Sequence, residues 1–171
     1  MKLSILIATL ESRKAQFERL CAFLEAQPCA AAVQILSVCD NGQMTIGAKR
    51  QMLLDHAAGD FIVYVDDDDE VASDYIPSIL AHCNDGVDCI GFRIDCYGYV
   101  RGKPGELEKA IVSNRYNMWA ENFDGFRYVR CPHHLVPVRR EHALKAGFDP
   151  KSRHGEDHAY SMRLLKLGLL K

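Results

Sequence analysis

Residues 61–70 read FIVYVDDDDE, so that five apolar or aromatic residues are followed at once by five acidic ones. The first five predict a buried strand, which ends at a fixed point on the edge of its sheet. Carboxylates crowded at such a point repel one another and raise each other's pKa, and a divalent cation relieves that repulsion. Open α/β sheets also bind ligands outside the carboxyl ends of their strands. The run therefore predicts a cation or ligand site, with a solvated acidic turn as the alternative.

The composition is that of a globular protein. The chain has 171 residues, of which 48% are hydrophobic and 26% charged, and its net charge is −2. This length suits one domain, and the charge gives no indication of a nucleic-acid partner. The longest apolar stretch near the amino end, residues 3–10, is too short to span a bilayer and lacks a signal-peptide cleavage pattern. We therefore expect a cytoplasmic protein without a transmembrane segment.

The seven cysteines include no C-x-x-C pair. Neither a disulfide framework nor a zinc ribbon is indicated, and most of these cysteines are expected to be small buried residues. A zinc site formed by Cys131, His133 and His134 is a minor alternative, because the spacing does not match the common zinc fingers.

Strand and helix patterns alternate through the first half of the chain. Residues 3–8, 33–38 and 61–65 read as buried strands, and helical patterns lie between them, the first behind Ser12 and the second behind Thr45 as possible caps. This β-α-β-α-β order predicts a parallel sheet with right-handed crossovers. The loops that follow the strands should therefore gather at one edge.

The second half is less regular. Five elements are predicted there: a helix at 75–83, strands at 88–97 and 126–130, a helix at 140–146, and a last helix opening at 155–157. Residues 98–122 carry glycines, one proline and scattered charges without a sustained period, which predicts an insertion or a mobile binding loop.

Five short motifs, in order and in rough spacing, resemble a family 2 glycosyltransferase of the GT-A fold. They are residues 4–9, Asp40, residues 47–51 (GAKRQ), residues 65–69 (VDDDD), and residues 155–157 (GED) followed by Arg163 and Leu164. The resemblance implies an α/β fold of the Rossmann-like nucleotide-diphospho-sugar transferase type, with a mixed sheet flanked by helices. It covers residues 1–171 as one domain, in which residues 1–97 form the nucleotide-sugar half and residues 98–171 the acceptor-side half.

The activity that the resemblance implies is inverting glycosyl transfer of the hexosyltransferase type. The donor would be a nucleotide diphosphate sugar, expected to be a UDP-sugar, and the acceptor a hydroxyl of a carbohydrate or another molecule, with Mn²⁺ or Mg²⁺ as cofactor. The family's D-x-D motif falls on Asp66, Asp67 and Asp68. Asp68 is then the direct metal ligand, Asp66 a partner of the metal or of the donor ribose, and Asp67 the variable position of the donor site.

The remaining donor contacts follow from the same resemblance. Thr9 and Glu11 lie just past the first strand, where family members hold the nucleoside. Asp40 matches the carboxylate that accepts a hydrogen bond from the base, expected to be uracil, although a turn-forming aspartate explains it equally well on local grounds. Lys49 and Arg50 lie near a helix amino terminus, which suits contacts with a diphosphate or donor sugar.

On the acceptor side, Asp157 matches the family's general base. Glu156 is expected to orient the acceptor or to pair with a nearby base such as Arg163. The alternative is that Glu156 and Asp157 only cap the last helix. His134 is a candidate for lining the donor or acceptor pocket, and Trp119 either stacks on a sugar face or is an ordinary buried aromatic residue.

The chain ends soon after Asp157, where many family members continue and often supply a histidine to the metal. Either the metal site is minimal, or His133, His134 or His154 substitutes, or the chain is shorter than a complete catalyst. Two other functions therefore remain: a sugar-nucleotide binding protein of GT-A fold without turnover, and a nucleotidyltransferase. The second would need a glycine-rich phosphate loop after the first strand, and residues 10–13 (LESR) contain no glycine.

Overall fold

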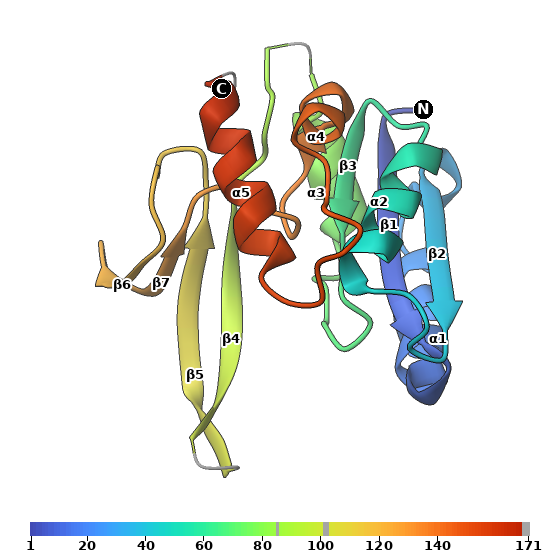
Figure 1. The fold of residues 1–171 in the computed structure, drawn as a ribbon, viewed down its shortest axis with the longest axis horizontal. Coiled ribbons are helices and arrows are strands. Elements are labelled where there is room, and N and C mark those ends of the chain that lie inside the picture. Colours follow the sequence, from blue (N-terminus) through green and yellow to red (C-terminus); the bar gives the residue numbers. More distant parts are fainter. Residues whose placement is uncertain (85, 101–102, 169–171) are drawn as a thin grey trace.

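The computed structural model describes residues 1–84, 86–100 and 103–168, and it contains two four-stranded sheets (Figure 1). The first sheet has the order β2-β1-β3-β8. Its strands are β1 (Leu3–Leu10), β2 (Gln34–Asp40), β3 (Phe61–Tyr64) and β8 (Val138–Arg139). The first strand pairs in parallel with β2 and β3, as predicted, and β8 runs antiparallel to β3. The sheet is therefore mixed, and its three parallel strands end at one edge.

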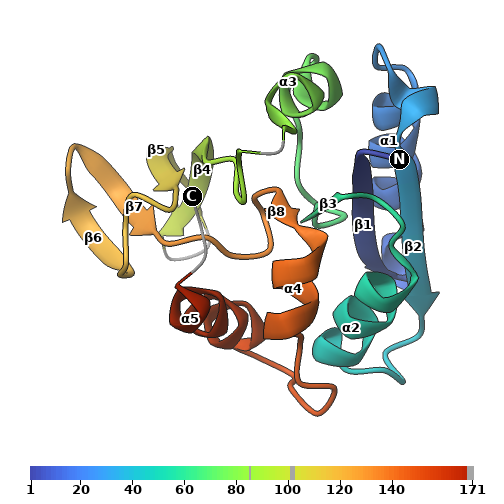
Figure 2. The ribbon, with the colours of Figure 1, turned by 90° about the horizontal axis from the view of Figure 1, so that it is seen from above.

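Helices cover both faces of this sheet (Figure 2). On one face lie α1 (Lys14–Glu25) and α3 (Tyr75–His82), and on the other α2 (Ile46–His56), α4 (Arg140–Ala146) and α5 (Glu156–Leu167). Successive side chains of β1 point to opposite faces: Ile5 and Ile7 pack in the cluster of α1 and α3, and Leu6 packs in the cluster of α2, α4 and α5. The mostly apolar sequence of β1, interrupted by Ser4 and Thr9, suits a strand that is buried on both faces of the sheet.

The second sheet has the order β4-β5-β7-β6. Its strands are β4 (Phe92–Val100), β5 (Lys103–Val112), β6 (Ala120–Phe123) and β7 (Phe126–Arg130). The prediction of a mobile loop at residues 98–122 is therefore wrong for most of that stretch, although residues 101 and 102 lie outside the described part; the alternative, an insertion, stays a prediction. The sequence signal was weak because, among the β5 side chains that the structure describes, the buried apolar ones are those of Ala110 and Val112, at the end of the strand.

The two sheets do not divide at residue 97, where the halves of the chain were expected to meet. Strand β4 crosses that position and pairs with β5 on its far side. Strand β8 comes from the second half of the chain and pairs with β3 in the first sheet. The second half therefore supplies part of the first sheet at the start of β3, and the carbonyl oxygen of His134 accepts a hydrogen bond from the amide of Tyr64 at the strand's carboxyl end.

The other predicted elements are confirmed within a few residues. Thr45 caps α2, because its hydroxyl oxygen accepts a hydrogen bond from the amide of Ala48 at 3.0 Å. The proposed Ser12 cap is wrong: a 3₁₀ turn, Glu11–Arg13, precedes α1, and α1 begins without a side-chain cap. Among the residues described, no helix combines the length and the apolar character that crossing a bilayer would need.

Candidate active site

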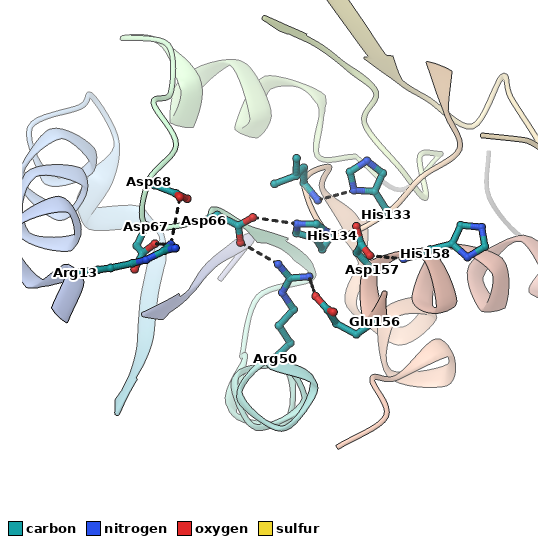
Figure 3. Close-up of polar contacts among 11 residues, drawn as sticks. Arg13, Arg50, Asp66, Asp67, Asp68, His133, His134, Glu156, Asp157 and His158 are labelled. Carbon is teal, nitrogen blue, oxygen red and sulfur yellow. Dashed lines mark hydrogen bonds and ion pairs between the residues drawn. The ribbon is translucent and has the colours of Figure 1, made fainter. Parts of the chain in front are cut away.

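The candidate site lies at the carboxyl ends of the three parallel strands (Figure 3). Thr9 and Asp40 come from the ends of β1 and β2, which are paired in register there, and Asp66 follows β3. Figure 3 shows the acids of residues 66–68 on one side of the cluster and Glu156 and Asp157, at the start of α5, on the other. The prediction that the loops after the parallel strands gather at one edge of the sheet is confirmed.

Asp67 and Asp68 have different surroundings although they are adjacent. Asp67 is buried and accepts hydrogen bonds from the Thr9 hydroxyl at 2.6 Å and from Arg13 Nη1 at 2.8 Å. Asp68 is half exposed, and its Oδ2 lies 3.2 Å from the same arginine nitrogen. Asp67 thus ties the acid run to the end of β1, while Asp68 keeps a carboxylate that solvent can reach. Sequence reasoning missed Arg13, whose only signal was its place just after the first strand.

Both carboxylate oxygens of Asp66 are engaged. Arg50 Nη2 donates to Oδ1 at 2.9 Å, and His134 Nε2 lies 3.4 Å from Oδ2. Burial alone would raise the pKa of Asp66, but the hydrogen bond and charge of His134 and the guanidinium of Arg50 outweigh it and hold the pKa well below its usual range. Asp66 is therefore a carboxylate kept ionised by its protein partners.

The repulsion expected within the acid run is evident at Asp69. Partial desolvation, followed by the charges of Asp66 and Asp68, raises its pKa to about 6. A cation beside this run would reduce the free energy needed to ionise Asp69. The sequence-based expectation of mutually perturbed carboxylates is thus met at this residue.

The side chains available as metal ligands determine which kind of metal site could form here. Across the described ranges, no group of three or more His, Cys, Asp or Glu side chains is arranged to hold a metal ion. The suggested zinc set of Cys131, His133 and His134 is thereby contradicted, and Cys131 Sγ instead lies 3.1 Å from the Ser161 hydroxyl. Mg²⁺ is commonly held by one or two carboxylates plus substrate phosphates. The residues fit a metal shared with a diphosphate, with Asp68 as the accessible ligand and Asp66 beside it.

Lys49 and Asp40 form an ion pair at the end of β2. The Lys49 side chain is 4% exposed, and its ammonium donates to the Asp40 carboxylate and to the carbonyl oxygen of Thr9. Asp40 also accepts hydrogen bonds from the amides of Gly42 at 3.1 Å and Met44 at 2.6 Å. The bond from Lys49 and those amides lower the pKa of Asp40 to about 2.

These contacts limit how Asp40 could bind a nucleobase and how Lys49 could bind a diphosphate. A carboxylate has about four acceptor positions, of which three are used here, so that about one is left for a base. Asp40 clearly organises the turn after β2, and contact with a nucleobase stays a prediction. Lys49 holds that turn to β1 and is buried, and its contact with a diphosphate also stays a prediction. Glu11 is exposed, and its Oε1 lies 3.4 Å from Cys39 Sγ at the same strand ends.

Glu156 pairs with Arg50 and not with Arg163. Arg50 Nη1 donates to Glu156 Oε1 at 2.7 Å, and both side chains are buried. Arg163 instead donates to the carbonyl oxygens of Ala146 and Gly147, each at 2.6 Å. The expected pairing of Glu156 with Arg163 is therefore wrong, because Arg163 points to the carboxyl end of α4.

Asp157 is partly exposed in the first turn of α5. Its Oδ1 accepts a hydrogen bond from the amide of His158 at 2.7 Å, and no ion pair to it occurs in the described part of the chain. A carboxylate with a free oxygen beside an acid cluster is suited to accept a proton from a substrate hydroxyl. The capping alternative is also visible, since the same side chain binds an amide of the first turn.

Trp119 and His133 lie next to the start of α5. The Trp119 indole donates to the Ser161 hydroxyl at 3.3 Å and packs edge-on against His158, with ring centroids 4.8 Å apart. It is neither fully buried nor fully exposed, so both predicted roles stay open for it. Burial, followed by the charges of His134 and Arg50, holds the pKa of His133 well below its usual range. His133 is therefore neutral at neutral pH.

Comparison with known proteins places this fold and site in a family. Residues 14–145 match the family described as glycosyl transferase family 2. The chain belongs to glycosyl transferase family 2. The match covers α2, the acid run and α4, and so most of the scaffold of the site.

Solved structures of S. aureus TarS share the fold of this family 2 member. TarS 1-349 aligns with a TM-score of 0.61 and 17% identity over 96% of this chain and 55% of that one. TarS 1-349 in complex with UDP-GlcNAc aligns with a TM-score of 0.61 and 15% identity over 96% of this chain and 53% of that one. The complex with UDP aligns with a TM-score of 0.61 and 15% identity over 96% of this chain and 55% of that one. The fold is accordingly the GT-A glycosyltransferase fold, and the chain spans about half the length of these structures. A comparison with curated proteins gives no match.

Proposed function

We propose that this protein transfers a sugar from a UDP-sugar to an acceptor hydroxyl with inversion, in a metal-dependent reaction. The observation that carries the proposal is that carboxylates lie on two opposite sides of one cluster. Asp66 and Asp68 lie at the end of β3, and Asp157 lies at the start of α5 (Figure 3). Membership of glycosyl transferase family 2 supports the reaction class. The fold shared with TarS, solved with UDP and with UDP-GlcNAc, supports a uridine donor.

The proposed reaction is a single displacement. Asp157 takes the proton of the acceptor hydroxyl as the acceptor oxygen forms a bond to the anomeric carbon of the donor sugar. The bond from that carbon to the diphosphate oxygen breaks, and its electron pair leaves with the diphosphate. Attack from the face opposite the leaving group inverts the anomeric centre. A well-placed general base contributes roughly 10²- to 10⁴-fold to such a step.

The leaving diphosphate accumulates negative charge, and a divalent cation supplies neutralisation of that charge when it is bound. Asp68 is the side chain here that solvent and ligand can reach. Asp66 is held by Arg50 and His134 and therefore keeps a fixed negative charge beside it. Arg50 itself is buried, so its proposed contribution to the donor site acts through Asp66.

Two measurements test the proposal. Titration of the protein with UDP, with and without Mn²⁺, should show binding that the metal strengthens, and UDP should bind better than CDP, which lacks a base N–H donor at the position facing Asp40. Incubation with UDP-sugars and a panel of hydroxyl acceptors should release UDP together with a glycosylated product. Tight metal-dependent UDP binding without any product would instead support a sugar-nucleotide binding protein. Release of pyrophosphate from a nucleoside triphosphate would support a nucleotidyltransferase.

A further inference from the structure

One guanidinium group connects the two sides of the candidate site. Arg50 Nη2 donates to Asp66 at 2.9 Å, and Arg50 Nη1 donates to Glu156 at 2.7 Å (Figure 3). The side chains of Arg50 and Glu156 are 5% and 8% exposed. Arg50 Nε has no hydrogen-bond partner within the part of the chain described. The connection therefore rests on two charge-assisted bonds, the stronger class of hydrogen bond; the one to Glu156 is buried, and the one to Asp66 is partly buried.

Arg50 is held in place by contacts with Tyr64 and Phe148. The Tyr64 hydroxyl on β3 donates to the backbone carbonyl oxygen of Arg50 at 2.6 Å. The centre of the guanidinium lies 5.8 Å from the Tyr64 ring and 6.0 Å from the Phe148 ring. These rings exclude water from the ion pair, and the lower local dielectric strengthens it. Arg50 thus offers the start of α5 a fixed point of attachment.

Asp157 has no comparable attachment of its own. Its carboxylate binds the amide of the next residue, His158, within the same helical turn. The residue before Glu156 is Gly155, at a φ of 70°, and the space around its Cβ position is open. A glycine in this conformation lets the chain turn into α5 but does not hold the helix in place. The position of Asp157 is consequently set by whatever fixes the first turn of α5.

We propose that Arg50 and Glu156 are positioning residues, whose ion pair fixes the first turn of α5 relative to Asp66 and so sets the separation between Asp157 and the donor-side acids. The inference rests on the proposed function as far as Asp157 is the base. Glu156 then acts through its neighbour and does not touch the acceptor. Displacement of a reacting group by about 1 Å can cost about 10²-fold in rate. Loss of the pair should therefore lower turnover far more than it lowers donor affinity.

Amide hydrogen exchange tests the positioning role without any transfer assay. The amide of Ala159 donates to the carbonyl oxygen of Gly155 at 3.0 Å and reports on the first turn of α5. In Glu156→Ala, exchange at Ala159 should accelerate by roughly tenfold or more, the factor that corresponds to about 1.4 kcal/mol. Glu156→Gln keeps an acceptor oxygen for Arg50 and should show a smaller acceleration. Unchanged exchange at Ala159 in both variants would overturn the proposal.

Arg50→Lys is the most informative partner variant. Lysine keeps the positive charge but is a single point donor on a flexible stem, and it cannot span Asp66 and Glu156 as a planar guanidinium does. Exchange at Ala159 should therefore accelerate in Arg50→Lys nearly as much as in Glu156→Ala. Arg139→Gln is the matched control, because in the described part of the chain the Arg139 side chain contacts the carbonyl oxygens of Asn84 and Val87, the Asp88 carboxylate and the Phe61 ring, all of which lie outside α5. That control should lower the melting temperature and leave Ala159 unchanged.

Turnover then separates positioning from donor binding. Glu156→Ala should reduce kcat by about 10²-fold while the affinity for UDP with Mn²⁺ stays within about twofold of the parent. Equal losses in kcat and in UDP affinity would assign the pair to the donor site and overturn the positioning role. A parent protein that transfers no sugar would contradict the proposed function, and exchange at Ala159 would still decide whether the ion pair fixes the helix.

Discussion

Arg13 Nη1 lies 2.8 Å from Asp67 Oδ1, so a cation of the protein itself is bound to the acid run after β3. The same nitrogen lies 3.2 Å from Asp68, the proposed metal ligand. The hydrogen bond to Asp67 and its charge raise the pKa of Arg13, which stays protonated throughout the accessible pH range. Arg13 therefore offsets part of the negative charge that a divalent cation would otherwise neutralise alone.

Arg13→Gln should bind Mn²⁺ more tightly than the parent protein, because it removes a competing positive charge. Arg13 is 44% exposed, and an exposed ion pair contributes up to about 1 kcal/mol, so the gain should not exceed about fivefold. Calorimetric titration with Mn²⁺ alone would measure it, and the difference should shrink as salt is added. Lys14→Gln makes the same change of charge one residue later and should have little effect. Weaker Mn²⁺ binding in Arg13→Gln would contradict the competition.

Asp68→Ala should abolish the stimulation of UDP binding by Mn²⁺. Asp68 is exposed and contributes little packing, so the free energy of unfolding should change by no more than about 0.5 kcal/mol. Titration with UDP in the presence and absence of Mn²⁺ gives the first quantity, and urea unfolding gives the second. Glu70→Ala removes a charge from the end of the same run and should keep the metal response. Retention of that response in Asp68→Ala would exclude this residue as the metal ligand.

Asp40 should make stability depend on acid pH. Because its pKa is lowered to about 2 in the folded protein, its ionised form stabilises the fold above its ordinary value near 4. That contribution is lost as pH falls from about 4 through about 2. Asp40→Asn should therefore be less stable than the parent at pH 6, and the two proteins should converge toward pH 2. Urea unfolding at several pH values would measure this, and a difference that does not depend on pH would contradict it.

The sequence predicted the scaffold of the site better than its connections. The strands β1, β2 and β3 were predictable because each carries a largely apolar run followed by polar residues; β1 and β3 are mostly buried, whereas β2, at the edge of the sheet, is only partly buried. In the second sheet, β4 and β7 were predicted as strands but β5 and β6 were not, and β5 mixes charged and apolar residues. Its pattern therefore resembled that of a loop.

Contacts between distant residues account for most of what the sequence could not show. Arg50 and Glu156 are 106 positions apart, and only the packing of α5 beside α2 and α4 brings them together. The engagement of Asp66 by Arg50 and His134 likewise depends on the segment before β8 returning to β3. The motifs named residues that the fold brings together, and the fold determines which carboxylate is accessible and which is already paired.

Asp157→Asn should separate a catalyst from a binding protein. Asparagine preserves the shape of the side chain but cannot accept a proton, so turnover should fall by roughly 10²- to 10⁴-fold. The affinity for UDP and Mn²⁺ should stay nearly unchanged, because Asp157 lies at the start of α5 and not in the acid run. Initial rates of product formation and UDP titrations would be measured on both proteins, with Arg153→Gln, at an exposed position of the preceding loop, as the control. Full turnover in Asp157→Asn would refute the assignment of the base even though the family membership would stand.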